Sequence, residues 1–298
     1  MTVIGSRGSA LALWQARHIA GKLEALGEQT RVEIIKTTGD KIQDVPLSQV
    51  GGKGLFTKEI EEALLAGAID LAVHSMKDVP AEVPRGLVLA AIPEREEARD
   101  ALIAHVPLAD LKPGAKIGTS SLRRSSQLRA LQRGLIIETL RGNVDTRLRR
   151  LDEGRYDAIV LAAAGLRRLG WQDRIRELIP VDVMCPAVGQ GALAIETRDD
   201  SGAAQELARR LNHAETSIAV SAERALLSTL GGGCQVPVGA HARLDGGTIR
   251  IHAIVASPDG SRLLRGDHEG TDPSVGVQLG SRLLDQGARE ILSEVYAA

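Results

Sequence analysis

Short apolar runs alternate with amphipathic stretches along the first part of the chain. Runs rich in β-branched residues at 2–5, 31–36 and 69–74 predict buried strands. Apolar positions with helical spacing over 10–26 and 57–66 predict helices between them. This β-α-β-α-β order is typical of parallel strands with helices on both faces of the sheet, so the first part of the chain predicts an α/β lobe.

The same alternation restarts after residue 115 and predicts a second lobe of similar order and size. Strands are predicted at 116–118, 136–140 and 158–162, with helices at 121–133 and 144–153. The segment 93–99 mixes acidic and basic residues and is the predicted crossing between the lobes. Two similar doubly wound α/β lobes around a cleft form a common architecture for holding small anions.

The last third of the chain has a different pattern. Runs at 236–244, 248–257 and 262–268 predict short strands, because hairpin signals centred on Gly246 and Gly260 separate them. Helices are predicted over 214–230 and, as one long amphipathic helix, over 275–295. The predicted division is a first lobe (1–94 and 190–212), a second lobe (95–189) and a small C-terminal α+β domain with a three-stranded antiparallel sheet (213–298).

The composition narrows the classes of protein that this fold could serve. Aromatic residues make up 2% of the 298 residues, which disfavours a nucleic-acid module built on stacked bases, and the net charge of −1 excludes a globally basic binder. No apolar run approaches the roughly 20 residues that span a bilayer, and the N-terminal pattern is unlike a signal peptide. Two cysteines are too few for a disulfide framework. We therefore expect a cytoplasmic protein with neither a nucleic-acid nor a membrane partner.

Cys234 follows three consecutive glycines at the end of the predicted helix 214–230. One glycine is enough to end a helix, and glycine also lets a bulky group approach the backbone closely. Three glycines therefore indicate that something large lies beside this thiol. A loop cysteine without any chemical role fits the same pattern.

Polar residues follow the strand predicted at 69–74. His74, Ser75, Lys77 and Asp78 come at its carboxyl end, which is where open α/β sheets bind ligands. Asp78 is a candidate for handling protons or stabilising a cation. The alternative is a polar turn in which Asp78 pairs with Lys77 or caps a helix.

Arginine is concentrated in the second lobe. Residues 121–180 contain thirteen arginines, seven acidic residues and no lysine, a composition that favours bidentate recognition of carboxylate or phosphate. Strand-to-helix junctions at 7–9, 118–124 and 141–147 place arginine near a predicted helix start, which also favours an anion. We therefore predict a small polyanionic ligand. The histidines and cysteines lack metal-ligand spacing, and the glycine-rich segment 51–54 lacks the spacing of a P-loop.

These segments together resemble the porphobilinogen deaminase (hydroxymethylbilane synthase) family over essentially the whole chain. The most specific segment is 223–239, which contains Cys234. The remaining segments occur in the family's order at 7–15, 51–56, 74–80, 118–124, 141–147 and 187–192. Cys185 stands where the resemblance implies no required thiol, and we expect it to be a small buried hydrophobe.

The resemblance implies lobes of the periplasmic-binding-protein type and an enzyme of tetrapyrrole and haem biosynthesis. Such a transferase condenses four porphobilinogen molecules head to tail, with loss of ammonia, and releases the linear tetrapyrrole hydroxymethylbilane by hydrolysis. The growing chain starts on a dipyrromethane cofactor, which would be joined by a thioether to Cys234. The resemblance also suggests a monomer.

The resemblance further implies residue roles. Asp78 matches the catalytic carboxylate, which would bind pyrrole N–H groups, stabilise positive charge and assist proton transfer. The expected cofactor-binding residues are Cys234, Lys77, Ser121, Arg123, Arg124, Arg147, Arg168, Asp40 and Thr119. The expected substrate-binding residues are Arg7, Ser9, Gln15, Arg141 and Gln190. Lys53 and Phe56 would belong to a lid, and no metal is expected.

Two other classes of function stay open on the residues alone. One is a two-lobed anion-binding protein without chemistry, in which Cys234 is incidental. The other is a hydrolase with a cysteine nucleophile, which needs a histidine near Cys234. His241 is close in sequence, but it falls in a predicted strand at an alternating position.

Overall fold

The computed structural model describes residues 1–41, 57–232 and 236–297. It divides into two compact units, Met1–Glu96 with Ala192–Ser217 and Glu97–Gly191 with Ile218–Ala298. The first unit contains the first lobe, and the second contains the second lobe and the C-terminal sheet. The finer boundaries of the three predicted domains stay a prediction.

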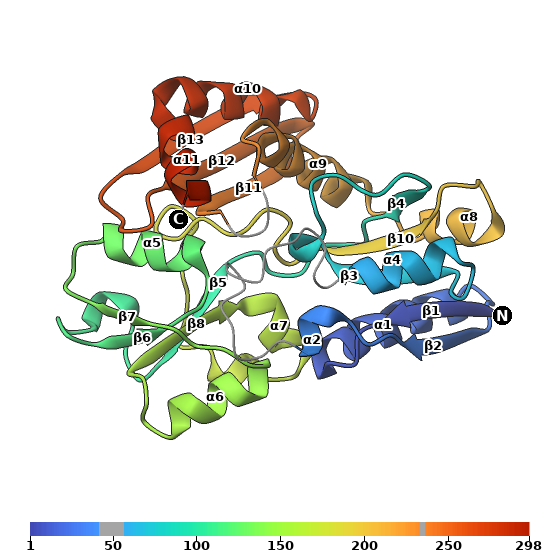
Figure 1. Cartoon of the computed structure of the whole chain (residues 1–298), viewed down its shortest axis with the longest axis horizontal. Coiled ribbons are helices and arrows are strands. Elements are labelled where there is room, and N and C mark those ends of the chain that lie inside the picture. The colour runs from blue at the N-terminus through green and yellow to red at the C-terminus, as the bar shows by residue number, and fades with distance from the viewer. Residues whose placement is uncertain (42–56, 233–235, 298) are drawn as a thin grey trace. The chain divides into compact units, whose positions relative to one another are not determined.

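The first lobe is built on a five-stranded sheet with the order β2-β1-β3-β10-β4 (Figure 1). Its strands are β1 (Thr2–Ser6), β2 (Thr30–Ile34), β3 (Leu71–Ser75), β4 (Leu87–Ala91) and β10 (Leu193–Arg198). β1 runs parallel to β2 and β3, whereas β10 returns antiparallel between β3 and β4. The predicted parallel core of this lobe is thus confirmed, with β10 as an addition.

Helices cover both faces of this sheet. They are α1 (Ala10–Glu24), α2 (Thr38–Lys41), α4 (Lys58–Leu65) and α8 (Ala203–Arg209), with a 3₁₀ turn, η1 (Met76–Asp78), after β3. Ile19 and Leu23 of α1 share one apolar core with Ala208 of α8. Ile60 and Leu64 of α4 belong to a separate core that includes β3 and β4 residues. The helices α1, α4 and α8 thus bury apolar side chains against the sheet, and the helical spacing predicts this for α1 and α4.

The second lobe repeats the architecture with the strand order β7-β6-β8-β5-β9. Its strands are β5 (Asp100–Ala104), β6 (Lys116–Gly118), β7 (Ile136–Glu138), β8 (Ala158–Ala162) and β9 (Glu177–Leu178). Its helices are α5 (Leu122–Ala130), α6 (Val144–Asp152) and α7 (Ala163–Arg168), with the 3₁₀ turns η2 (Leu108–Asp110) and η3 (Gln172–Arg174). Leu128 of α5 lies in one core, and Leu148 of α6 and Leu166 of α7 lie in another. The doubly wound arrangement is therefore confirmed here too.

The C-terminal region carries the predicted three-stranded antiparallel sheet. Its elements are α9 (Ala214–Thr229), β11 (Val238–Asp245), β12 (Thr248–Ala256), β13 (Leu263–Gly270), α10 (Ser274–Leu283), a π-helical segment (Leu284–Ala288) and α11 (Arg289–Ala297). One face of the sheet packs in a core with Leu226, Leu279 and Ile291 from the helices. The other face holds Ile254 and Ala256 against Cys185.

The prediction of one continuous helix over 275–295 is wrong. The helix breaks at Gly287, whose φ is 105°, inside the π-helical segment. A positive φ carries no steric penalty for glycine, whereas a regular helix needs a negative one. The apolar spacing continues across the break, and for that reason it hid the break in the sequence.

Within the described ranges, no helix combines the length and the apolarity that crossing a membrane requires.

Candidate active site

In the first lobe, the carboxyl ends of β1 and β3 bring two predicted segments to one edge of the sheet. The strands are parallel, so the residues that follow Ser6 and Ser75 emerge at the same edge. Ser9 is the N-cap of α1, and its hydroxyl accepts a hydrogen bond from the Ala12 amide at 3.3 Å. Arg7 and Ser9 are both half-buried at this helix start.

Gln15 joins the two segments from the inside. Its side chain is 2% exposed, and its Nε2 donates to the Ser75 hydroxyl at 2.9 Å. The structure thus places Gln15, an expected substrate-binding residue, beneath the end of β3. Its hydrogen bond to Ser75 holds the end of β3 in place.

Asp78 closes the 3₁₀ turn η1 directly after β3. The Met76 amide donates to the Ala192 carbonyl at 3.0 Å, and the Val79 amide donates to the Met76 carbonyl at 3.1 Å, so backbone bonds on both sides hold the turn. Lys77 and Asp78 are half-buried. Within the part of the chain that the structure describes, the Asp78 carboxylate makes no hydrogen bond or ion pair, so its oxygens are available to a ligand.

A buried acid–base pair lies next to this turn. His74 Nε2 is 3.0 Å from Glu196 Oε2, and both side chains are almost fully buried. Glu61 of α4 is half-buried near them. Burial raises its pKa first of all, with a further rise from Glu196 that hydrogen bonding from Thr57 and the charge on His74 oppose. The turn that holds Asp78 therefore follows a strand whose His74 lies close to acidic side chains from β10 and α4.

In the second lobe, α5 starts with the predicted hydroxyl groups. Ser121 is its N-cap, and its hydroxyl accepts from the Arg124 amide at 3.5 Å. Thr119 is buried, and its hydroxyl accepts from the Ser121 amide at 3.2 Å. This start lies at the carboxyl end of β6, the edge at which anions bind in such sheets.

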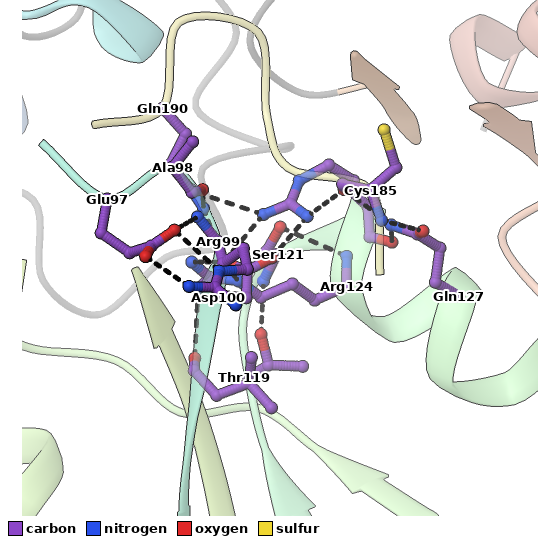
Figure 2. Close-up of polar contacts among 12 residues, drawn as sticks. Glu97, Ala98, Arg99, Asp100, Thr119, Ser121, Arg124, Gln127, Cys185 and Gln190 are labelled. Carbon is purple, nitrogen blue, oxygen red and sulfur yellow. Dashed lines mark hydrogen bonds and ion pairs between the residues drawn. The ribbon is translucent and has the colours of Figure 1, made fainter. Parts of the chain in front are cut away.

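Arg123 and Arg124 of α5 both bind Asp100, the first residue of β5. Figure 2 shows Arg124 beside Asp100. Asp100 is completely buried, and its Oδ2 lies 2.7 Å from Arg123 Nη1. Its Oδ1 accepts from Arg124 Nε at 3.0 Å and from Arg124 Nη2 at 2.8 Å. Both arginines are themselves buried, at 4% and 6% exposure. The residues that the sequence predicted for an anion are thus already organised around an internal carboxylate.

Gln190 belongs to the same buried cluster. It sits between Gly189 and Gly191, whose φ values of 70° and 89° form a turn that favours glycine. Its Nε2 donates to the Ala98 carbonyl at 2.7 Å and to Asp100 Oδ1 at 2.9 Å. The structure therefore places Gln190, another expected substrate-binding residue, inside the lobe with no exposed surface.

Arg147 lies in a group of arginines. Its Nε donates to the Gly142 carbonyl at 2.7 Å. Its pKa falls to about 10, first because of burial and then because of the charges on Arg124, Arg141 and Arg150. A guanidinium held under these conditions gains from an added anion, because the anion relieves both the desolvation and the repulsion.

Arg168, at the end of α7, completes the set of expected arginines in this lobe. Its side chain is buried, and its Nη2 donates to the Gly191 carbonyl at 2.6 Å. The bond ties α7 to the turn that holds Gln190.

Some expected site residues lie outside the description. These are Cys234, Lys53, Phe56 and the side chain of Asp40. The helix that leads to Cys234 is nevertheless well anchored, because the fully buried Glu223 of α9 accepts from the amides of Gly189 and Ala242, both at 2.7 Å. Among the residues that are described, no cluster of His, Cys, Asp and Glu could hold a metal ion.

Cys185 is buried and unpaired, and burial raises the pKa of its thiol far above the usual range. A thiol in this state is a poor nucleophile, in agreement with the structural role expected for it.

Comparison with known proteins decides the family. The family model described as "Porphobilinogen deaminase, dipyromethane cofactor binding domain" matches residues 2–206, and "Porphobilinogen deaminase, C-terminal domain" matches residues 217–286. The chain belongs to the porphobilinogen deaminase family. The porphobilinogen deaminase of Syntrophobacter fumaroxidans is 53% identical over 302 residues, covering 99% of this chain and 98% of the relative. That of Geobacillus kaustophilus is 52% identical over 299 residues, covering 98% of this chain and 97% of the relative.

Among solved structures, a periplasmic substrate-binding protein of an ABC transporter from Coxiella burnetii shares 14% identity, with a TM-score of 0.44. The likeness covers 71% of this chain and 92% of that one.

Membership of the porphobilinogen deaminase family shows that a dipyrromethane cofactor belongs to this protein. The described residues fit such a group, because its carboxylates match the arginines of the second lobe and its pyrrole N–H groups match the unpartnered Asp78 carboxylate. Sequence reasoning missed Asp100. Its only signal is a charged residue at the first position of an otherwise apolar strand, Asp100–Ala104.

Proposed function

We propose that this protein is a hydroxymethylbilane synthase that condenses four porphobilinogen molecules head to tail on a dipyrromethane group carried by Cys234. The observation that carries the proposal is the arginine group around Arg147, within a chain whose residues 2–206 and 217–286 match the family. Porphobilinogen carries two carboxylates, so a growing chain accumulates negative charge with each unit. A guanidinium whose charge is disfavoured by burial and by neighbouring arginines, as that of Arg147 is, suits such a ligand.

The second lobe is proposed to hold carboxylates. Arg124, Arg147 and Arg168 would bind them by charge-assisted hydrogen bonds, each worth about 1.5–3 kcal/mol. Ser121 and Thr119 would add hydroxyl or amide donors at the start of α5. Arg141 is proposed to bind the carboxylates of the incoming substrate or the elongating chain. Arg123 and Gln190 are so enclosed by internal partners that we propose they shape this surface more than they touch the ligand.

The first lobe is proposed to supply the chemistry. Each condensation forms a bond between the free α-carbon of the chain and the aminomethyl carbon of porphobilinogen, and it breaks the bond to ammonia. When bound, the dipyrromethane group supplies the first such α-carbon. The Asp78 carboxylate would accept hydrogen bonds from pyrrole N–H groups and stabilise the positive charge that develops on the ring. It would also hold the proton that the attacking carbon loses. Lys77, Arg7 and Ser9, at the same edge of the sheet, would bind carboxylates.

The expected Cys234 attachment, the lid residues Lys53 and Phe56 and the cofactor contact of Asp40 complete this proposal. They rest on the family pattern in the sequence. We further propose a cytoplasmic monomer without nucleic-acid or membrane partners. The net charge of −1 and the presence of only two cysteines support that part of the proposal.

The proposal is tested by incubating the purified protein with porphobilinogen and measuring ammonia and tetrapyrrole together. We expect four ammonia molecules per linear tetrapyrrole. Raising the ionic strength should weaken substrate binding, because the binding surface acts by charge. Tight binding of porphobilinogen without release of ammonia would instead identify an anion-binding protein and refute the proposed function.

A further inference from the structure

The buried carboxylate of Asp100 has more partners than a simple ion pair needs. Oδ2 accepts from Arg123, while Oδ1 accepts from both Nε and Nη2 of Arg124 and from Gln190 Nε2. Figure 2 shows Arg124 and Gln190 reaching Asp100 from different segments of the second lobe. The strand β5, the helix α5 and the turn before β10 therefore meet on one side chain.

We infer that Asp100 is a positioning residue of the proposed reaction: it orients the Arg124 guanidinium so that the remaining N–H groups of Arg124 bind carboxylates of the dipyrromethane cofactor. This inference rests on the proposed function, because it assigns a role in holding the proposed cofactor. It concerns a residue that touches neither cofactor nor substrate.

The hydrogen-bond donors of the two arginines are used differently. A guanidinium has five N–H groups. Arg123 donates four hydrogen bonds: two to Asp100, one to the Cys185 carbonyl at 2.6 Å and one to Gln190 Oε1 at 3.4 Å. Arg124 donates three hydrogen bonds: two to Asp100 and one to the Val160 carbonyl at 3.1 Å. Toward the described residues, Arg124 thus keeps two N–H groups, one on each terminal nitrogen, whereas Arg123 keeps one.

The charges of the cluster leave an excess that an anion can neutralise. Burial alone would raise the pKa of Asp100, but the charges and hydrogen bonds of Arg123 and Arg124 outweigh it and hold that pKa well below its usual range. The pKa of Arg124 is lowered, mainly by burial. One permanent negative charge therefore faces two buried positive charges, and the second positive charge remains for a ligand.

Stability does not account for this arrangement. A buried ion pair gains little over apolar side chains of the same volume, because desolvation offsets the attraction. Removing one partner is costly, however, since it leaves an uncompensated buried charge. A test must therefore separate the charge balance that Asp100 provides from the orientation that it imposes on Arg124.

The test compares Asp100→Asn with the double variant Asp100→Asn/Arg123→Gln. The single variant removes a negative charge and leaves two cations. The double variant removes one charge of each sign, so the charge balance around Arg124 returns while the carboxylate that orients it does not. Glu97→Gln is the matched control, because Glu97 is an ion-paired carboxylate of the same lobe whose partners are Arg99 and Arg167.

The melting temperature and the fraction of purified chains that carry the cofactor mass are measured for each protein. We expect the single variant to lose both stability and cofactor. The double variant should regain most of the melting temperature while its loaded fraction stays about tenfold or more below that of the wild type, the loss typical of one charge-assisted hydrogen bond. Glu97→Gln should stay loaded.

A double variant that regains cofactor together with stability would overturn the inference, because Asp100 would then only balance charge. A double variant that does not fold would also overturn it, because Asp100 would then be needed by the fold itself. An equal loss of cofactor in Glu97→Gln would also overturn the inference, because the loss of any carboxylate in this lobe would then be enough to prevent cofactor binding. A wild type without the cofactor mass, even after incubation with porphobilinogen, would instead refute the proposed function.

Discussion

The two lobes share an architecture but differ in the charged side chains that they bury. In the first lobe, His74 and Glu196 form a buried pair of one base and one acid, close to the half-buried Glu61. In the second lobe, one acid, Asp100, faces two arginines. The first cluster consists of carboxyl and imidazole side chains, which can gain or lose a proton, whereas guanidinium groups donate hydrogen bonds as permanent cations.

This difference suggests a division of labour on one fold. The lobe with titratable groups also carries the candidate catalytic carboxylate, Asp78, at the end of the strand that holds His74. The lobe with permanent positive charge carries the arginines that suit carboxylates. Substitutions of the site residues in the first lobe should therefore lower turnover, and substitutions of those in the second lobe should lower the fraction of chains that carry the cofactor.

The largest expected effect is that of Asp78→Asn. The amide cannot hold a proton or stabilise a cation as a carboxylate does, so turnover should fall about 10²–10⁴-fold. The cofactor mass and the melting temperature should stay at wild-type values, because Asp78 has no partner among the described side chains. Steady-state kinetics and intact mass check both points, with the exposed Glu94 as Glu94→Gln for a control. Wild-type turnover in Asp78→Asn would remove Asp78 from the mechanism.

In the second lobe, Arg147→Gln should separate binding from stability. Burial and neighbouring arginines lower the pKa of Arg147 to about 10, so its charge is unfavourable in the folded protein below that pH. Removing it should leave the free energy of unfolding unchanged or slightly higher. The loaded fraction should nevertheless fall about tenfold or more, as one charge-assisted hydrogen bond is lost.

Denaturant unfolding and intact mass measure these two effects of Arg147→Gln. The exposed Arg149, four residues before its ion-pair partner Glu153, serves as the control Arg149→Gln. A loss of stability together with full cofactor loading in Arg147→Gln would show that Arg147 stabilises the fold and does not bind the cofactor.

A smaller effect is expected from Glu196. Glu196→Leu leaves His74 buried without its partner and should lower the free energy of unfolding by about 1–3 kcal/mol. Glu196→Gln keeps a hydrogen-bonding oxygen and should cost less. Urea denaturation measures both. Equal losses in the two variants would show that the charge on Glu196 matters more than its hydrogen bond to His74.

The smallest effect concerns Glu97 and depends on pH. Hydrogen bonds from Arg99, together with its charge and that of Arg167, lower the pKa of Glu97 from 4.5 to about 2 against an opposing effect of burial. Because the pKa is lower in the folded protein, the stabilisation is complete above about pH 4.5 and is lost as the pH falls toward 2. Because the Arg99 side chain is 39% exposed to solvent, this stabilisation is limited to about 1 kcal/mol.

Melting temperatures of the wild type and Glu97→Gln, measured from pH 7 to pH 2.5, test the expected stabilisation. The difference between the two proteins should shrink as the pH falls. A difference in melting temperature that grows toward low pH would contradict the expected direction of the pH dependence.

The sequence predicts the local elements well because each lobe repeats strands and helices whose apolar spacing is set by the nearby core. It does not predict how distant strands pair. The sequence analysis assigns 190–212 to the first lobe, but nothing in the pattern of β10 (Leu193–Arg198) indicates that it pairs antiparallel between β3 and β4. The break at Gly287 was missed because apolar spacing continues through it.

The same contrast holds for the site. Asp78 stands just after the end of β3 and Arg147 in the first turn of α6, as the pattern indicates, since strand ends and helix starts follow directly from local sequence. Gln15 and Gln190 also lie near strand ends, but their burial depends on distant partners, namely Ser75 and Asp100. Asp100 was missed for the same reason. Its role depends on the two arginines that the fold brings next to it, and these lie more than twenty residues away in the sequence.

The central claim is most directly tested by the intact mass of the denatured protein, compared between the wild type, Cys234→Ser and Cys185→Ser. The wild type and Cys185→Ser should both carry an added mass equal to two porphobilinogen molecules less two ammonia, because Cys185 is buried and its thiol is held protonated. Cys234→Ser should show the bare polypeptide. Retention of the added mass in Cys234→Ser, or a bare wild type after incubation with porphobilinogen, would contradict the account.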